Sequence, residues 1–248
     1  MNLDKAKEEF LKYTEKYNLE NENLKRKQLH SVRVMEISKQ IAEKLQLSKD
    51  EVDLAALIGL LHDIARFEQF TQYRTFKDIE SFDHGDFGAE ILKKEGFDEI
   101  VVKAVKNHNK YEIEEGLTTE QKLFAKIIRD ADKIDIFYES VEMFWKEREE
   151  EVEKSIISEK TINEFNNFLQ VKSRENQSAI DDIVKIIAFI FDINFKESFK
   201  IIEENDYINK MLNRYDIKDQ YTREKIEEIR LIANKYIKKA KKEPAPNG

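Results

Sequence analysis

The chain of 248 residues contains no cysteine, and its only two prolines, Pro244 and Pro246, lie near the C-terminal end. The absence of cysteine excludes a disulfide framework and a thiolate zinc site. Glycine is also scarce, with 6 residues in the whole sequence. Because proline and glycine are the residues that interrupt helices, a chain with so few of them and rich in Lys, Glu, Ile and Leu is predicted to be all-α.

Positive net charge and long apolar runs are missing as well. The formal net charge is −8, whereas a protein that grips a duplex nucleic acid needs a positive face. The longest apolar runs, residues 54–61 and 186–191, are too short to cross a bilayer. The first residues are polar and lack the apolar core of a signal peptide. We therefore expect a cytoplasmic protein that binds neither duplex nucleic acid nor a membrane.

The segment 54–61 is apolar on all sides and runs directly into the pair His62 and Asp63. A helix with no polar face is predicted to be buried, so this pair is expected at the edge of the core. Ser48, followed three residues later by Glu51, predicts a capping box at the start of the same helix. A buried carboxylate beside an imidazole is costly unless something compensates, and a metal ion would use both groups.

The sequence has 4 histidines, and we predict that each lies on the apolar side of its own helix, close to one end. Two aspartates share this placement. Taken singly, each of these residues could be a polar group satisfied inside the core, but together they predict a common site. Six ligands are too many for one catalytic ion with an open position, whereas two ions sharing the carboxylate of Asp63 would use them all, as in paired-metal hydrolases. The six residues, called here the His–Asp cluster, are His30, His62, Asp63, His84, His108 and Asp132.

Imidazole and carboxylate ligands suit two divalent transition metal ions, namely Mn, Fe, Co, Ni or Zn, with Mg as an alternative at one site. The aromatic stretch 67–82 has no helical period and is predicted to be a lid or pocket wall, whose rings would hold a base or another flat group. Arg66 is expected either to bind phosphate oxygens or to form a salt bridge with a nearby carboxylate. The further candidates for substrate binding are Gln69, Tyr73 and Lys133.

No linker rich in Gly, Ser or Pro separates the two halves of the chain. We predict a metal-binding core with an N-terminal helix over residues 1–140, a C-terminal helical extension packed on it over 141–242, and a frayed tail over 243–248. Three helices are expected in the extension, and they cover about 140–172, 177–202 and 206–240. The extension is expected to cover the pocket, to form a homodimer surface, or only to pack against the core.

The order and spacing of the six residues in the His–Asp cluster resemble the H…HD…H…H…D pattern of the HD-domain superfamily of metal-dependent phosphohydrolases. The additional histidines are similar to those of its binuclear branch, which includes HD-type diadenosine tetraphosphate hydrolases and HD-GYP cyclic-dinucleotide phosphodiesterases. The resemblance extends over roughly residues 25–140. It departs from the family at Ala65 and Arg66, where many members have Gly and Lys, and no Gly-Tyr-Pro motif is present.

The resemblance implies a compact helical domain with the metals in its centre and with Asp63 and a water or hydroxide bridging the two ions. One ion would be held by His30, His62, Asp63 and Asp132, and the other by Asp63, His84 and His108. It further implies hydrolysis of a phosphate ester or anhydride in a small phosphorylated substrate, such as a nucleotide. The bridging hydroxide would attack phosphorus, with Asp63 and Arg66 as the catalytic residues.

Two other functions use the same ligands. A few proteins of this fold hold two irons and cleave bonds with O₂, which would make the protein a di-iron oxygenase. A non-catalytic module that senses a nucleotide and signals through the C-terminal helices is the other alternative. The complete set of ligands favours an enzyme over the sensor, and the identity of the substrate stays open.

Overall fold

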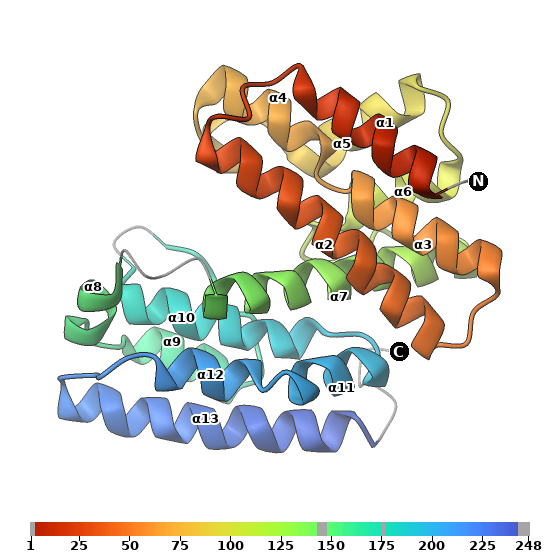
Figure 1. The fold of residues 1–248 in the computed structure, drawn as a ribbon. Helices are drawn as coiled ribbons and strands as arrows, with labels where there is room; N and C mark the ends of the chain where they lie inside the picture. The colour runs from red at the N-terminus through yellow and green to blue at the C-terminus, as the bar shows by residue number, and fades with distance from the viewer. Residues whose placement is uncertain (1–2, 143–147, 175–176, 243–248) are drawn as a thin grey trace. The chain divides into compact units, whose positions relative to one another are not determined.

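The computed structural model describes residues 3–142, 148–174 and 177–242, and within these ranges the structure contains helices and no strand. The prediction of an all-α protein is confirmed (Figure 1). The chain divides into two compact units, Met1–Asp132 and Lys133–Gly248, and the division falls inside helix α7 (Thr119–Glu142). The predicted tail 243–248 lies outside the described residues.

The first unit is built from helices that bury one apolar side each around the central helix α3. Before α7 it contains α1 (Leu3–Glu15), α2 (Glu22–Lys44), α3 (Lys49–Leu61), α4 (Ile64–Tyr73), a short 3₁₀ helix (Asp78–Glu80), α5 (His84–Lys94) and α6 (Glu99–Asn107). The capping box predicted for α3 is confirmed, since Ser48 and Glu51 exchange hydrogen bonds. From Ala55 to Leu61 every side chain of α3 is buried, which explains its lack of a polar face.

Helices α2 and α3 pack very closely at Gly59. A Cβ atom at this position would lie 2.6 Å from the Ser38 Oγ, 2.7 Å from the Val34 carbonyl oxygen and 2.9 Å from the Met35 Cα. These distances are too short for any side chain, and two of the three involve backbone atoms that cannot rotate away. Glycine at this point therefore sets the spacing of the two helices that carry His30 and His62.

We expect Gly59→Ala to lower the free energy of unfolding by about 3 kcal/mol because overpacking forces these helices apart. The measurement is urea denaturation followed by far-ultraviolet circular dichroism. Gly88→Ala is the matched control, because its Cβ would meet the Val105 Cγ1 at 3.2 Å, a contact that a small side-chain shift relieves. Equal midpoints for the two variants would contradict the close packing at Gly59.

The second unit contains the end of α7 and a set of shorter helices. They are α8 (Glu149–Lys154), α9 (Glu159–Asn166), α10 (Ala179–Ile187), a 3₁₀ helix (Ala188–Asp192), α11 (Lys196–Glu204), α12 (Tyr207–Asn213) and α13 (Gln220–Ala240). Helix α13 packs against α9, α11 and α12 (Figure 1). The unit has its own apolar core, to which α10 contributes Ile180, Ile183 and Ile187.

The prediction of three long helices in the C-terminal half is wrong, because each expected span contains a break between helices in the described residues. These breaks need neither proline nor glycine. Ser158 begins α9 by accepting a hydrogen bond from the Thr161 amide, and Asp219 begins α13 in the same way with Thr222. Serine and aspartate favour the start of a new helix by accepting a hydrogen bond from one of its first amides.

Two further expectations need correction in the first unit. The stretch 67–82 was predicted to be irregular, but residues 67–73 belong to α4, and only residues 74–83 lie outside an α-helix. The aromatic side chains Phe67 and Phe70 are buried in the core instead of lining an exposed wall. His30 and Asp132 were placed near helix ends, whereas they lie well inside α2 and α7.

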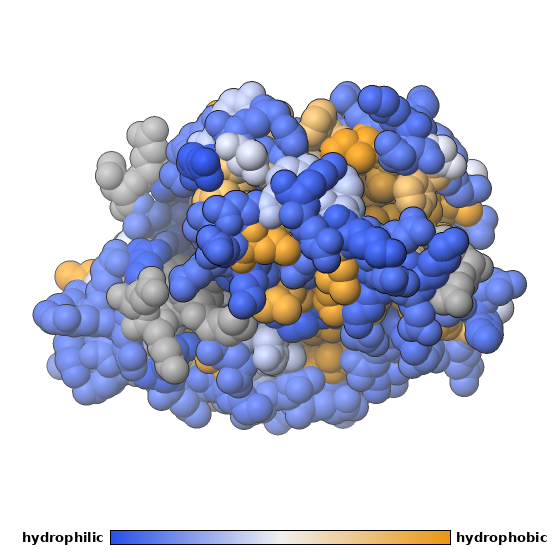
Figure 2. All heavy atoms as spheres, turned by 45° about the horizontal axis from the view of Figure 1, so that its top comes forward, coloured by the Kyte–Doolittle hydropathy of each residue, from blue (hydrophilic) through white to orange (hydrophobic). Residues whose placement is uncertain are grey.

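In the part of the chain that the structure describes, no helix is both long enough and apolar enough to span a membrane. The face drawn in Figure 2 is mostly hydrophilic, with apolar residues in separate patches.

Candidate metal centre

The six residues of the His–Asp cluster come together in the first unit, although they lie in or at the ends of six different helices. They are His30 in α2, His62 at the C-cap of α3, Asp63 at the N-cap of α4, His84 at the start of α5, His108 at the C-cap of α6 and Asp132 in α7. The histidines and Asp63 are at most 5% exposed. The side chain of Asp132 is 22% exposed, so the cluster is closest to solvent on that side.

Asp63 lies between two pairs of histidines. Its Oδ2 atom is 3.6 Å from the Nε2 atoms of His30 and His62. Its Oδ1 atom is 3.6 Å from the Nε2 atoms of His84 and His108. Within each pair the two Nε2 atoms are 3.2 Å and 3.0 Å apart, respectively. One carboxylate therefore presents a separate oxygen to each pair, which is the arrangement of a bridging ligand.

Asp132 adds a further oxygen to the first pair, since its Oδ1 is 3.2 Å from His30 Nε2 and 3.6 Å from His62 Nε2. Ligands bound at about 2.1 Å from one ion lie about 3.0 Å apart at neighbouring octahedral corners and about 3.4 Å apart in a tetrahedron. The separations of 3.0 to 3.2 Å between the paired Nε2 atoms and between His30 and Asp132 fall in this range, and the separations of 3.6 Å lie slightly above it. Both groups of donors, with nitrogen and oxygen together, therefore fit a divalent transition metal ion.

Hydrogen bonds on the far side of the rings fix which nitrogen faces the cluster. The Nδ1 atoms of His62 and His108 donate to the carbonyl oxygens of Gly59 at 2.8 Å and Val105 at 2.6 Å. The Nδ1 of His84 donates to Asp78 Oδ2 at 2.7 Å. With Nδ1 protonated, the neutral ring turns the lone pair of Nε2 toward the cluster, as a metal ligand requires.

Protonation is a poor alternative to a metal ion at these rings. Two lone pairs at the distance of the His84 and His108 Nε2 atoms cannot hydrogen-bond to each other unless one ring gains a proton. Burial lowers the pKa of His84 to about 4, and it also lowers the pKa of His62. The rings of His62 and His84 are therefore neutral near pH 7, and a shared cation is what the geometry of the cluster accommodates.

Two cations flank the carboxylate of Asp63. The Lys27 Nζ lies 2.8 Å from Oδ2, and the Arg66 Nε lies 3.5 Å from Oδ1. Burial by itself would raise the pKa of Asp63, but the charge of Lys27, with the neighbouring histidines and Arg66, holds this pKa well below its usual range. For Asp132, burial is likewise outweighed by its polar contacts with His30 and His62, which keep its pKa low. Both carboxylates are thus ionised.

Arg66 forms the salt bridge that was one of its two predicted roles. Its Nη1 donates to Asp78 Oδ1 at 2.9 Å and to the Phe76 carbonyl oxygen at 2.6 Å. Its Nε is buried and, among the described residues, has no hydrogen-bond partner. The guanidinium group is therefore held in place by its terminal nitrogen beside Asp63.

The other substrate-binding candidates are placed differently from one another. Gln69 is fully buried, and its amide nitrogen donates to Asp78, Ser81 and the Phe82 carbonyl oxygen. Its side chain therefore fixes residues 78–82 and has no exposed surface that a substrate could contact. Tyr73 is 47% exposed and rests edge-on against the Phe82 ring. Lys133 belongs to the second unit, where its Nζ pairs with Asp192 at 2.7 Å.

Sequence reasoning missed Lys27 and Asp78. Lys27 precedes His30 by three residues on one helix, a spacing that puts both on the same face. Because α2 begins at Glu22, the spacing was a usable signal. Asp78 lies in the irregular segment 74–83, where no periodicity indicates which side chain points inward.

Asp78 joins Arg66 to the second histidine pair, because one carboxylate accepts from both Arg66 and His84. We expect Asp78→Asn to weaken metal binding by the pair His84 and His108 by about 10- to 100-fold, since an amide orients the imidazole less firmly than a carboxylate. Titration of the metal-free protein with Mn²⁺ or Co²⁺ measures this. Asp50→Asn, an exposed change in the first turn of α3, is the control. Unchanged affinity for both ions would show that Asp78 does not position His84.

Residues 29–136 match the HD domain family. This segment, which is less than half of the chain, carries all six residues of the His–Asp cluster. The match supports the resemblance of this segment to the HD superfamily of metal-dependent phosphohydrolases. The comparisons with curated proteins and with solved structures gave no match.

Proposed function

We propose that the protein is a metal-dependent phosphohydrolase that uses two divalent transition metal ions to cleave a phosphate ester or anhydride, with a nucleotide as the substrate. The observation that carries this proposal is the position of Asp63, with one carboxylate oxygen directed at each histidine pair. A pair of divalent ions at such a site acidifies a water between them and stabilises negative charge on phosphoryl oxygens.

The residues around the cluster supply the remaining requirements for phosphoryl transfer. Lys27 and Arg66 bring two positive charges to the buried Asp63, where charge that develops on a phosphoryl group would be stabilised. The guanidinium of Arg66 is already fixed by Asp78, so little freedom is lost when an anion binds. His62 and His108 keep their Nδ1 protons on backbone carbonyl oxygens, which holds both rings in one orientation throughout the reaction.

An aromatic ring lies beside these cations. The Lys27 Nζ is 5.6 Å from the centroid of Phe76, and the guanidinium carbon of Arg66 is 5.8 Å from it. Phe76 is only partly buried, so its ring is available to a flat group attached to the phosphate. Two cations and a ring at one site support a nucleotide over a simple neutral substrate, and this favours the phosphohydrolase over the di-iron oxygenase.

The decisive experiment is metal analysis of the purified full chain, followed by a phosphate-release screen over nucleoside mono-, di- and triphosphates and dinucleoside polyphosphates. The screen is run with Mn, Fe, Co, Ni, Zn and Mg in turn. We expect about two metal ions per chain and turnover that chelation abolishes. Iron with O₂ consumption and no phosphate release would establish the oxygenase instead. Tight nucleotide binding without turnover under any metal would establish the sensor.

Lys27→Gln tests the contact between this lysine and the substrate phosphate. We expect the KM for the active nucleotide to rise by about tenfold, because a charge-assisted hydrogen bond is lost, while the metal content of the folded protein is unchanged. Lys25→Gln, an exposed change on the same helix, is the control. An unchanged KM and kcat in Lys27→Gln would remove Lys27 from the substrate site.

A further inference from the structure

A cavity of about 630 Å³ lies in the first unit and is separate from the metal centre. Residues of α1, α3, α4 and α5 line it, and none of the six residues of the His–Asp cluster does. Leu61 and Ile64, the immediate neighbours of the His62-Asp63 pair, contribute to its wall. The side chains of His62 and Asp63 therefore lie in the metal centre, whereas the flanking side chains of Leu61 and Ile64 line the cavity.

Most of the residues that line the cavity are aliphatic or aromatic, and the charged residues Lys5, Glu9, Lys16 and Glu95 line it as well. Phe10, Leu57, Leu61 and Leu92 line it, although each is at most 7% exposed. Protein interiors contain few voids larger than a water molecule, whereas small-molecule sites have volumes of about 300–1,000 Å³. The volume and the apolar wall are those of a site for a ligand with a substantial hydrocarbon part.

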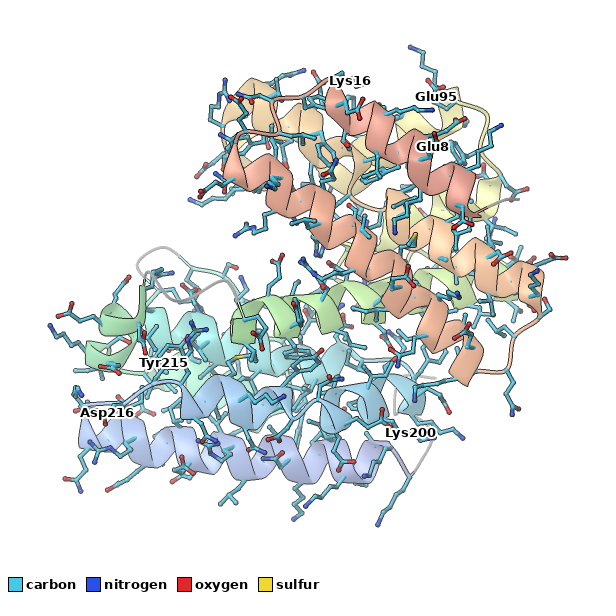
Figure 3. All side chains as sticks on the ribbon, viewed as in Figure 1. Glu8, Lys16, Glu95, Lys200, Tyr215 and Asp216 are labelled. Atoms are coloured by element: carbon cyan, nitrogen blue, oxygen red, sulfur yellow. The ribbon has the colours of Figure 1, made fainter. Side chains whose placement is uncertain are left out.

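Charged residues at the rim restrict what the polar end of this ligand can be. Lys16, which directly follows α1, lines the cavity, and its Nζ lies 3.6 Å from the ring centroid of Tyr13 and 5.2 Å from that of Tyr17. Among the described residues, no carboxylate pairs with it. Glu95, at the end of α5, also lines the rim but lies apart from Lys16 (Figure 3). An anionic group is therefore accommodated at the Lys16 end and repelled near Glu9 and Glu95.

We propose that this cavity binds a linear aliphatic carboxylate, with the hydrocarbon chain against Phe10, Leu57 and Leu92 and the carboxylate at Lys16. Apolar contact supplies most of the affinity, because each buried methylene contributes by its area. The lysine selects the anionic end. The site is distinct from the proposed phosphohydrolase centre, and its occupation does not depend on that activity.

The test is isothermal titration calorimetry on the full chain with saturated fatty acids of 8 to about 16 carbons and with the alcohols of the same lengths. We expect saturable binding of one acid per chain, with affinity rising about fourfold per methylene until the cavity is filled. Each acid is expected to bind about two- to fivefold more tightly than its alcohol. Affinity that does not depend on chain length, or no saturable binding, would overturn the proposal.

Three variants locate the ligand. Ala6→Trp places a bulky side chain in the cavity without removing a core contact and is expected to abolish binding. Ile91→Trp fills the cavity from α5 in the same way. Ile91→Trp is used in place of Ala6→Trp if the Ala6→Trp protein melts at a much lower temperature. Lys16→Gln is expected to weaken the acids two- to fivefold and leave the alcohols unchanged. The matched control Lys12→Gln, on the exposed side of α1 and paired with Glu8, is expected to change neither.

A chelator separates this site from the metal centre, which could itself attract a carboxylate. We expect the affinity for the acids to be the same with and without a chelator. Binding that disappears on chelation would place the carboxylate on the metal ions and overturn the proposal. Unchanged binding in folded Ala6→Trp and Ile91→Trp would place the ligand elsewhere on the chain, with the same consequence. Equal affinities of acids and alcohols would exclude an anionic ligand.

Discussion

Replacing Asp63 with asparagine is expected to remove both metal ions from the protein, whereas replacing His84 with glutamine removes only one. Asp63 is the residue whose carboxylate reaches both histidine pairs, one oxygen to each. An amide offers a single weak oxygen ligand, so neither group of donors stays complete. His84 contributes to the second pair alone and leaves His30, His62 and Asp132 in place around Asp63.

The measurement is metal content by inductively coupled plasma mass spectrometry after dialysis against a fixed free concentration of Mn²⁺ or Co²⁺. We expect about two ions per chain in the unchanged protein, about one in His84→Gln and about none in Asp63→Asn. Phosphate release should fall on the order of 10³-fold in Asp63→Asn, because stabilisation of the transition-state charge is lost with the ions.

Asp98→Asn is the control for these variants. Asp98 caps α6 by accepting from the Ile100 amide, and asparagine is an equally good cap, so metal content and activity are expected to stay unchanged. Circular dichroism establishes that the Asp63→Asn protein is folded before it is analysed. A folded Asp63→Asn protein that still holds one ion per chain would show that the carboxylate does not bridge the two groups of donors.

Removal of the metal is expected to lower the melting temperature of the protein strongly. A ligand that binds only the folded state stabilises it by about 4 kcal/mol when its free concentration is 1,000 times its Kd. For a unit of this size the corresponding shift in Tm is on the order of 10 °C. The physical reason is that four imidazoles and two ionised carboxylates share a mostly buried volume, where a cation neutralises charge that burial makes costly.

Differential scanning calorimetry with excess Mn²⁺ and with a chelator measures this shift. The Asp63→Asn variant serves as the control, since its melting temperature is expected to be the same under both conditions. A chelator effect of equal size in that variant would arise away from the cluster. If the unchanged protein also melts at one temperature under both conditions, the cluster does not hold a metal ion in the folded state.

Much of the metal centre was predictable because its chemistry is concentrated in rare residues. With only 4 histidines in the chain and each predicted on an apolar helix side, convergence was the simplest explanation, and the structure brings all four together with Asp63 and Asp132. The buried character of α3 followed from its lack of a polar face. These inferences rest on helical periodicity, which is local and therefore visible in the sequence.

Features that depend on long-range contacts were not predictable in the same way. The position of Gln69 is an example: its residue type and its place beside Arg66 suggested a substrate contact, but it is the approach of residues 78–82 that uses its amide and buries it. The breaks in the C-terminal helices were not predicted, because no proline or glycine marks them and Ser158 and Asp219 begin new helices by capping instead.

The sequence alone predicted that the protein is helical, that its histidines and two aspartates form a site, and which residues a metal ion would meet there. Only the tertiary structure decided which oxygen of Asp63 faces each histidine pair, that Lys27 and Asp78 contact the cluster, and that a cavity opens on the other side of the same backbone. The reason is physical: helical periodicity fixes which face a side chain occupies, but the distance between side chains on different helices depends on how closely those helices pack, as Gly59 shows for α2 and α3.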